Sequence, residues 1–153
     1  MELKIVPYKN FKKIYFNFLV ICVLIIAAGF VMYKKHLALL PGFLAAYSLT
    51  NVLIYAIVGA ALIAVFYLLN NNNRNKLKKL ATFDDRISFY SRFYTRRLWW
   101  HVISCLTSVL FLQLTWHYIF IYFGLFDLLS MLSAFPSREI LKKDLGEDDL
   151  IFN

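Results

Sequence analysis

Four long apolar windows, almost free of charge, constrain this chain more than any other feature of its sequence. They lie at about residues 14–33, 49–69, 97–116 and 118–135, and Asp127 is the only acidic residue within them. A helix of about 20 apolar residues crosses a hydrocarbon core of about 30 Å. Lipid cannot satisfy an open backbone, and the windows do not alternate as barrel strands do, so each window predicts a transmembrane helix.

The composition supports this interpretation. Apolar residues make up 61% of the chain and charged residues 17%, against about 45–50% and about 25% in soluble domains. A length of 153 residues suits one domain. We therefore predict a single integral membrane domain over residues 1–153. Its fold class is all-α, a polytopic four-transmembrane-helix bundle that runs up-down-up-down.

The distribution of Lys and Arg predicts the orientation. Four of these residues precede the first window, eight lie between the second window and the first residue of the third, Arg97, which is included in the count, and three follow the fourth. Only Lys34 and Lys35 lie between the first and second windows. Because basic residues stay on the cytoplasmic side, this asymmetry of fifteen to two predicts that both termini are inside. We expect the membrane to be the bacterial cytoplasmic (inner) membrane.

A basic cytoplasmic loop is predicted over residues 70–96. Asparagines between Asn70 and Asn75 indicate a turn after the second window. Thr82 then precedes two acids, Asp84 and Asp85, which is typical of a helix start. We therefore expect the third helix to begin near residue 83 and to extend into the cytoplasm.

The cytoplasmic C-terminal tail covers residues 136–153. Pro136 is expected to end the fourth helix, and Ser137 to cap a short helix that stops near Gly146. The acidic stretch at residues 147–149 is expected to be mobile.

The third and fourth windows predict a tight hairpin that turns around Trp116 and His117, because only His117 lies between them. Counted along the helices from this turn, Asp127 lies at the depth of three hydroxyl side chains on the neighbouring helix: Ser104, Thr107 and Ser108. An acid near the middle of a bilayer costs several kcal/mol unless it is paired or protonated. These four residues are therefore a candidate ion or proton site, or a hydrogen-bonded post that ties the two helices together.

Basic side chains at the inner interface form a second candidate site. The residues expected to contact anionic lipid are Arg92, Arg96, Arg97 and Arg138. Because topology already accounts for the basic charge, nucleic acid is not expected as a partner.

The sequence predicts no metal site, no cofactor and no catalytic residue. His101 and His117 are about 24 Å apart on one helix, so they cannot share a haem or a metal ion. Cys22 and Cys105 both lie in apolar windows and are expected to be small buried hydrophobes. No phosphate-binding, zinc or nucleophile motif is present.

These observations favour a small non-catalytic membrane protein, an accessory, assembly or regulatory subunit that acts through helix contacts. Its partners would be the lipid bilayer and another membrane chain, or a second copy of itself. A stripe of small residues, Ala56, Ala60 and Ala64, would allow a close approach of helices. The alternative is a homo-oligomeric small transporter or channel that uses Asp127. A third hypothesis, a lipid-modifying enzyme, would need the basic residues at the inner interface together with His101.

Overall fold

The computed structural model describes residues 4–37, 49–147 and 149–153. The helices within these residues are α1 (Tyr8–Lys34), α2 (Leu49–Lys78), α3 (Phe83–Thr115), α4 (Ile119–Leu132) and α5 (Arg138–Leu145). Two short strands, β1 (Ile5–Val6) and β2 (Ile151–Phe152), lie near the ends of the chain. Helices make up 81% of the structure, which confirms the prediction of an all-α chain.

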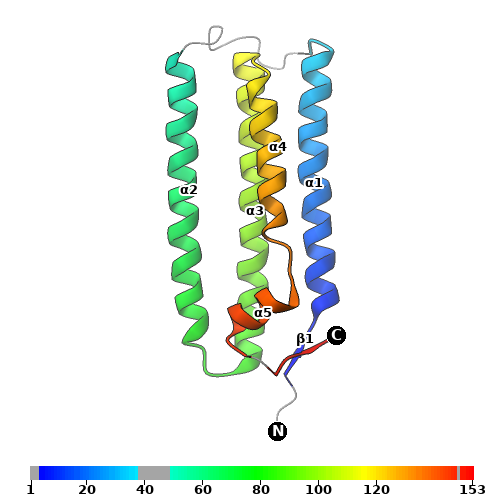
Figure 1. Ribbon diagram of the computed structural model, residues 1–153, viewed down its shortest axis with the longest axis vertical. Coiled ribbons are helices and arrows are strands. Elements are labelled where there is room, and N and C mark those ends of the chain that lie inside the picture. Colours follow the sequence, from blue (N-terminus) through cyan, green and yellow to red (C-terminus); the bar gives the residue numbers. More distant parts are fainter. Residues whose placement is uncertain (1–3, 38–48, 148) are drawn as a thin grey trace.

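Three helices, α1, α2 and α3, are long and apolar enough to cross a membrane. Figure 1 shows them lying side by side with α4 along the long axis of the molecule. Both chain ends lie at one end of these helices, the lower end in Figure 1, which we call the basal end. The chain thus has the features of an integral membrane protein.

Helix α4 is shorter than the window at 118–135 predicted. It has 14 residues and is about 21 Å long. After Leu132 the backbone continues in tighter turns, in which Ser133, Ala134 and Phe135 each donate to the carbonyl three residues earlier. Pro136 disfavours helical backbone in the residue before it, so the helix cannot run on to the proline.

Tyrosines from two other helices donate hydrogen bonds to carbonyls at the end of α4, where Met131 and Ala134 are buried. The Tyr15 hydroxyl of α1 donates at 3.4 Å to the Met131 carbonyl, which also accepts from the Ala134 amide. The Tyr94 hydroxyl of α3 donates to the Ala134 carbonyl at 3.0 Å. Because carbonyls at a helix end are costly to leave without a partner, the bond from Tyr94 helps α4 to stop at this point.

Helix α2 is longer than predicted, and the expected turn at Asn70–Asn75 is wrong. The helix continues through the asparagines to Lys78. Asparagine is only a moderately poor helix former, and tertiary contacts override such preferences. Here Leu77 is 1% exposed, and Arg74 pairs with Asp144 of α5 at 3.0 Å. The predicted loop is therefore mostly helical, and α2 and α3 are joined by residues 79–82.

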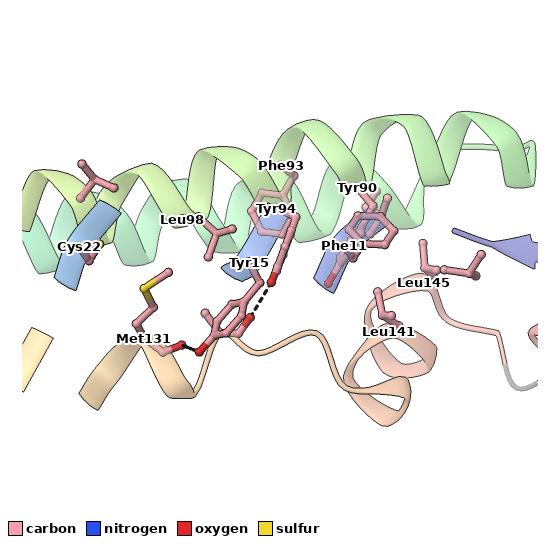
Figure 2. Packing of buried hydrophobic residues seen from close by; sticks show 14 of the residues in the cluster. Phe11, Tyr15, Cys22, Tyr90, Phe93, Tyr94, Leu98, Met131, Leu141 and Leu145 are labelled. Carbon is pink, nitrogen blue, oxygen red and sulfur yellow. Dashed lines mark hydrogen bonds between the residues drawn. The ribbon is translucent and has the colours of Figure 1, made fainter. Parts of the chain in front are cut away.

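The hydrophobic core lies among α1, α3 and α4 and continues to Leu141 and Leu145 of α5, as Figure 2 shows. Its largest fully buried side chains include Tyr15, Tyr90, Tyr94, Leu98 and Met131. Cys22 and Cys105 are also fully buried, which confirms their prediction as small buried hydrophobes.

Glycines set the distance between helices in this core. A Cβ at Gly29 of α1 would lie 2.7 Å from Cγ2 of Val109 on α3. A Cβ at Gly124 of α4 would lie 2.3 Å from Cδ1 of Ile26. Both positions therefore depend on the missing side chain for close helix packing.

The predicted helix ends are confirmed where a capping residue marked them. The Thr82 hydroxyl accepts a hydrogen bond from the Asp85 amide at the start of α3. The Ser137 hydroxyl accepts from the Ile140 amide at the start of α5, and Gly146 ends that helix in the left-handed region. Trp116 ends α3 in the same region, and its amide donates to the Leu112 carbonyl. The α3–α4 turn is as short as predicted.

The basal end is more ordered than the sequence suggested. Strands β1 and β2 pair in parallel, with Ile5 opposite Ile151 and Val6 opposite Phe152. The expectation of a mobile acidic tail is wrong for Glu147, which forms ion pairs with Lys4 and with Arg86. Residue 148 lies outside the described residues.

Candidate functional site: a polar cleft beside the second helix

Asp127 lies on α4 and is held by hydroxyl groups. Its Oδ2 accepts a hydrogen bond from the Ser108 hydroxyl of α3 at 3.2 Å. Ser108 is fully buried, and its oxygen also lies 3.2 Å from the Tyr55 hydroxyl of α2. One hydrogen-bonded chain therefore links α2, α3 and α4. Among the described residues the ion pairs lie at the basal end, and none of them includes Asp127.

A second group of polar side chains lies about one turn nearer the basal end. The Ser130 hydroxyl donates to the Asp127 carbonyl at 2.7 Å and lies 3.5 Å from Nδ1 of His101 on α3. Ser133 follows on α4 and donates to the Ser130 carbonyl at 2.7 Å. An imidazole and two hydroxyls therefore follow the carboxyl group of Asp127 along the helix axes toward the basal end.

The two polar groups border a cleft of about 300 Å³ between α2, α3 and α4, which we call the polar cleft. Its polar lining consists of Arg97, His101, Ser104, Asp127, Ser130 and Ser133. Its apolar lining consists of Leu62, Ile63, Phe66, Trp100, Ile103 and Phe126. An acid, a guanidinium, an imidazole and three hydroxyls therefore share one space with aromatic and aliphatic walls.

The polar cleft exists because α2 packs loosely. No residue in the most apolar window of α2 is buried, against 44% of the corresponding window in α3 and 22% in α1. Near the end of the bundle opposite the basal end, Tyr55 fixes α2 through edge contacts with Phe111 and Phe120, at centroid distances of 4.8 Å. At the basal end, Arg74 fixes it through the ion pair with Asp144. Between these two contacts, Gly59 has open space where a side chain would be. The helix thus stands slightly away from its neighbours.

The structure brings together only part of the predicted site. Ser108 donates a hydrogen bond to Asp127, and Ser104 lines the polar cleft together with Asp127. Thr107 does not join them: it is half-buried, it is not part of the cleft lining, and its hydroxyl donates to the Ile103 carbonyl of its own helix at 2.8 Å. Residues 104 and 108 are four apart and share one face of the helix, whereas residue 107 lies about 100° round the helix from residue 108.

Tyr55 is not among the predicted site residues, and the sequence predicts other roles for His101 and Arg97. His101 enters the predictions only with the basic residues of a lipid-modifying enzyme, yet it lines the polar cleft with Arg97. The signal was present on α3, because residues 97, 101, 104 and 108 recur at helical spacing. Nothing in the sequence shows that α2 would face this stripe, so Tyr55 could not be assigned.

The four predicted lipid-contact residues lie in different surroundings. Arg92 and Arg96 are exposed, as lipid contact requires. Arg97 is half-buried in the polar cleft, and its Nε is a buried donor with no hydrogen-bond partner among the described residues. Arg138 is exposed but lies over the rings of Tyr8 and Phe152 at 5.7 and 5.6 Å. Cation–π contacts of this kind hold Arg138 against the paired ends of the chain.

Within the ranges that the structure describes, no three His, Cys, Asp or Glu side chains gather closely enough to hold a metal ion. Comparisons of the chain with protein-family models, with curated proteins and with solved structures gave no match.

Proposed function

We propose that the chain crosses the bacterial cytoplasmic membrane four times, with both termini in the cytoplasm and consecutive helices alternating in direction. The basic residues support this topology. The N-terminal tail, the α2–α3 region and the C-terminal tail together hold fifteen of the seventeen Lys and Arg residues. The basal end would then be the cytoplasmic end. Helix α4, although short, would cross because the Tyr94 hydroxyl satisfies the Ala134 carbonyl just after its end, below the membrane surface.

We propose further that the protein is a non-catalytic accessory, assembly or regulatory subunit that binds another membrane chain through α2. The observation that carries this proposal is the absence of buried residues in the apolar window of that helix. Helices α1, α3 and α4 form a core together, whereas α2 packs mainly against α3. A helix that contributes so little to its own core leaves most of its surface for lipid or for a partner.

The small-residue stripe of α2 lies on the outward part of this surface. Residues that face α3 recur at Tyr55, Leu62 and Phe66, and all three are half-buried. Ala56, Ala60 and the third alanine at position 64 are exposed, so the stripe is not used inside the bundle. Small residues at four-residue spacing let two helix backbones approach closely, which favours a partner helix over lipid at this face.

Native mass spectrometry of the protein extracted gently from its own membrane tests this proposal. A larger chain at a fixed ratio is expected. Ala60→Leu should release that chain, because a bulky side chain separates the helices. Ala61→Leu is the matched control, since Ala61 is exposed on the same helix but outside the stripe. A stable chain without a partner would overturn the proposal, as would equal retention of the partner by both variants.

A second candidate is a homo-oligomeric transporter or channel that uses Asp127. Its support is the hydrogen-bonded chain from Tyr55 through Ser108 to Asp127, next to a cleft that also holds His101. A clean homodimer or higher ring in the mass spectrum would favour this function. Proton or cation flux into liposomes should then be lost in Asp127→Asn and kept in Thr107→Val. Unchanged flux in Asp127→Asn would exclude it.

A further inference from the structure

The polar cleft has the features of a ligand site that is reached from the bilayer. Two of its lining residues, Ile63 of α2 and Phe126 of α4, are 70% and 68% exposed. They belong to the rim, so in a membrane the cleft opens toward lipid. Its volume of about 300 Å³ lies at the lower end of the range for small-molecule sites, about 300–1,000 Å³. That is room for a compact head group, whose tail would extend into the surrounding lipid.

We propose that the polar cleft binds a lipid-soluble molecule with a flat, uncharged head that exchanges hydrogen bonds, the chemistry of a quinone or quinol. This site is separate from the α2 stripe and does not depend on the proposed partner. Only binding is proposed, with no change in the oxidation state of the ligand.

The walls of the cleft suit a flat ring. Phe66 of α2, Trp100 of α3 and Phe126 of α4 supply aromatic faces from three helices. Phe66 and Trp100 already pack edge to face, with centroids 6.1 Å apart. Aromatic pairs prefer such edge-to-face or offset geometry, and a planar head group can extend the same packing. Aliphatic side chains complete the walls and continue to the open rim.

The polar groups of the cleft lie at two heights along the helix axes. His101 and Ser130 form the pair nearer the basal end, and Ser104 and Asp127 form the pair farther from it. On each helix the two heights are three residues apart, which corresponds to about 4.5 Å of rise. A six-membered ring with oxygen atoms at opposite edges can therefore meet one pair with each oxygen. Hydroxyl and imidazole groups donate to a quinone carbonyl, and a carboxylate accepts from a quinol hydroxyl.

The charges of the cleft favour an uncharged head over a lipid phosphate. Arg97 is the permanent cation of the lining, and Asp127 is an acid within the same space. A phosphate bound deep in the cleft would approach the carboxylate of Asp127, which is unfavourable at low dielectric. An uncharged head needs only hydrogen bonds, and the lining supplies several.

Fluorescence quenching in nanodiscs tests the proposal. The probe is decylubiquinone, added to the full chain in phosphatidylcholine discs, because Trp100 lies in the wall of the cleft. We expect a saturable component of quenching, above the quenching of Trp99 and Trp116, that disappears in Trp100→Phe. His101→Ala and Asp127→Asn should each raise the dissociation constant at least tenfold. Thr107→Val, the matched control on α3 outside the cleft lining, should change it less than twofold.

Two further measurements separate the proposal from its alternatives. Ile63→Phe narrows the exposed rim without removing a polar group or adding a fluorescent tryptophan, so it should weaken binding even if a polar variant fails to fold. Discs that contain phosphatidylglycerol distinguish a quinone from a lipid phosphate. The proposal is overturned if quenching is not saturable, if the polar variants bind like the parent chain, or if phosphatidylglycerol displaces the quinone through Arg97. Loss of the partner in native mass spectrometry would leave this binding result intact.

Discussion

Replacement of Gly29 by alanine is the sharpest test of how α1 and α3 pack. A Cβ at this position would lie 2.7 Å from Cγ2 and 3.0 Å from Cγ1 of Val109. Valine on a helix has one strongly preferred rotamer, so its methyl groups cannot turn away. The helices must separate instead, and overpacking of this kind costs about 1–3 kcal/mol.

Gly59→Ala is the matched control for this substitution. It is also a glycine in the middle of an apolar helix, but nothing lies within 4 Å of the added Cβ. Both variants gain the same helix preference for alanine over glycine, about 1 kcal/mol. The difference between them therefore isolates the contact with Val109, and we expect Gly29→Ala to be less stable than Gly59→Ala by about 1–3 kcal/mol.

Thermal unfolding of both variants in one detergent, followed by helical circular dichroism, measures this difference. For a chain of this size, 1 kcal/mol corresponds to a shift of about 2–4 °C in the midpoint. Gly29→Ala combined with Val109→Ala should recover most of the loss, because the smaller side chain makes room. If Gly29→Ala melts at or above Gly59→Ala, helices α1 and α3 do not meet at this position.

Three other predictions concern the contacts that join α2 and the basal end to the core. Asp144→Asn should destabilise the protein by about 1–2 kcal/mol in thermal unfolding, because its side chain is 4% exposed and pairs with Arg74, whose own 43% exposure reduces the loss. The hydrogen bond from Lys4, with the charges of Lys4 and Arg86, lowers the pKa of Glu147. The ionised carboxylate therefore stabilises the fold at pH values above the ordinary pKa of glutamate, and this contribution is lost as the pH falls through the lowered pKa. In Glu147→Gln the melting temperature should accordingly fall less steeply with decreasing pH than in the parent chain. Tyr55→Phe keeps the aromatic contacts but loses the hydrogen bond to Ser108, so the free energy of unfolding should fall by about 0.6 kcal/mol. A decrease in the free energy of unfolding of more than about 2 kcal/mol would contradict this account.

The sequence predicted features whose cause is local. Apolar windows of sufficient length identify helices because lipid leaves the backbone few choices. The ends at Thr82, Ser137 and Gly146 follow from side chains and backbone angles within one turn. Depth along a hairpin is also local, so the bond between Ser108 and Asp127 could be predicted by counting residues from the turn.

Features that depend on a distant segment could not be predicted in this way. Helix α2 continues past its asparagines because Arg74 meets Asp144, seventy residues later. The polar cleft forms because α2 lies opposite α3, and the periodicity of neither helix specifies that these two helices face each other. The two-residue strands carry almost no signal of their own, since each is defined only by the other.

The pairing of those strands has a consequence for the order of events during synthesis. Residues 5 and 6 leave the ribosome before any of the described helices, yet their strand partners lie at 151 and 152. The amide of Asn153 donates to the Val6 carbonyl, and the amide of Lys9 donates to the Asn153 carbonyl. Contacts between such distant positions form late, because a long stretch of chain must be ordered first. Helix α1 must therefore enter the membrane with its first residues unpaired, and the basal end can close only after every helix is in place.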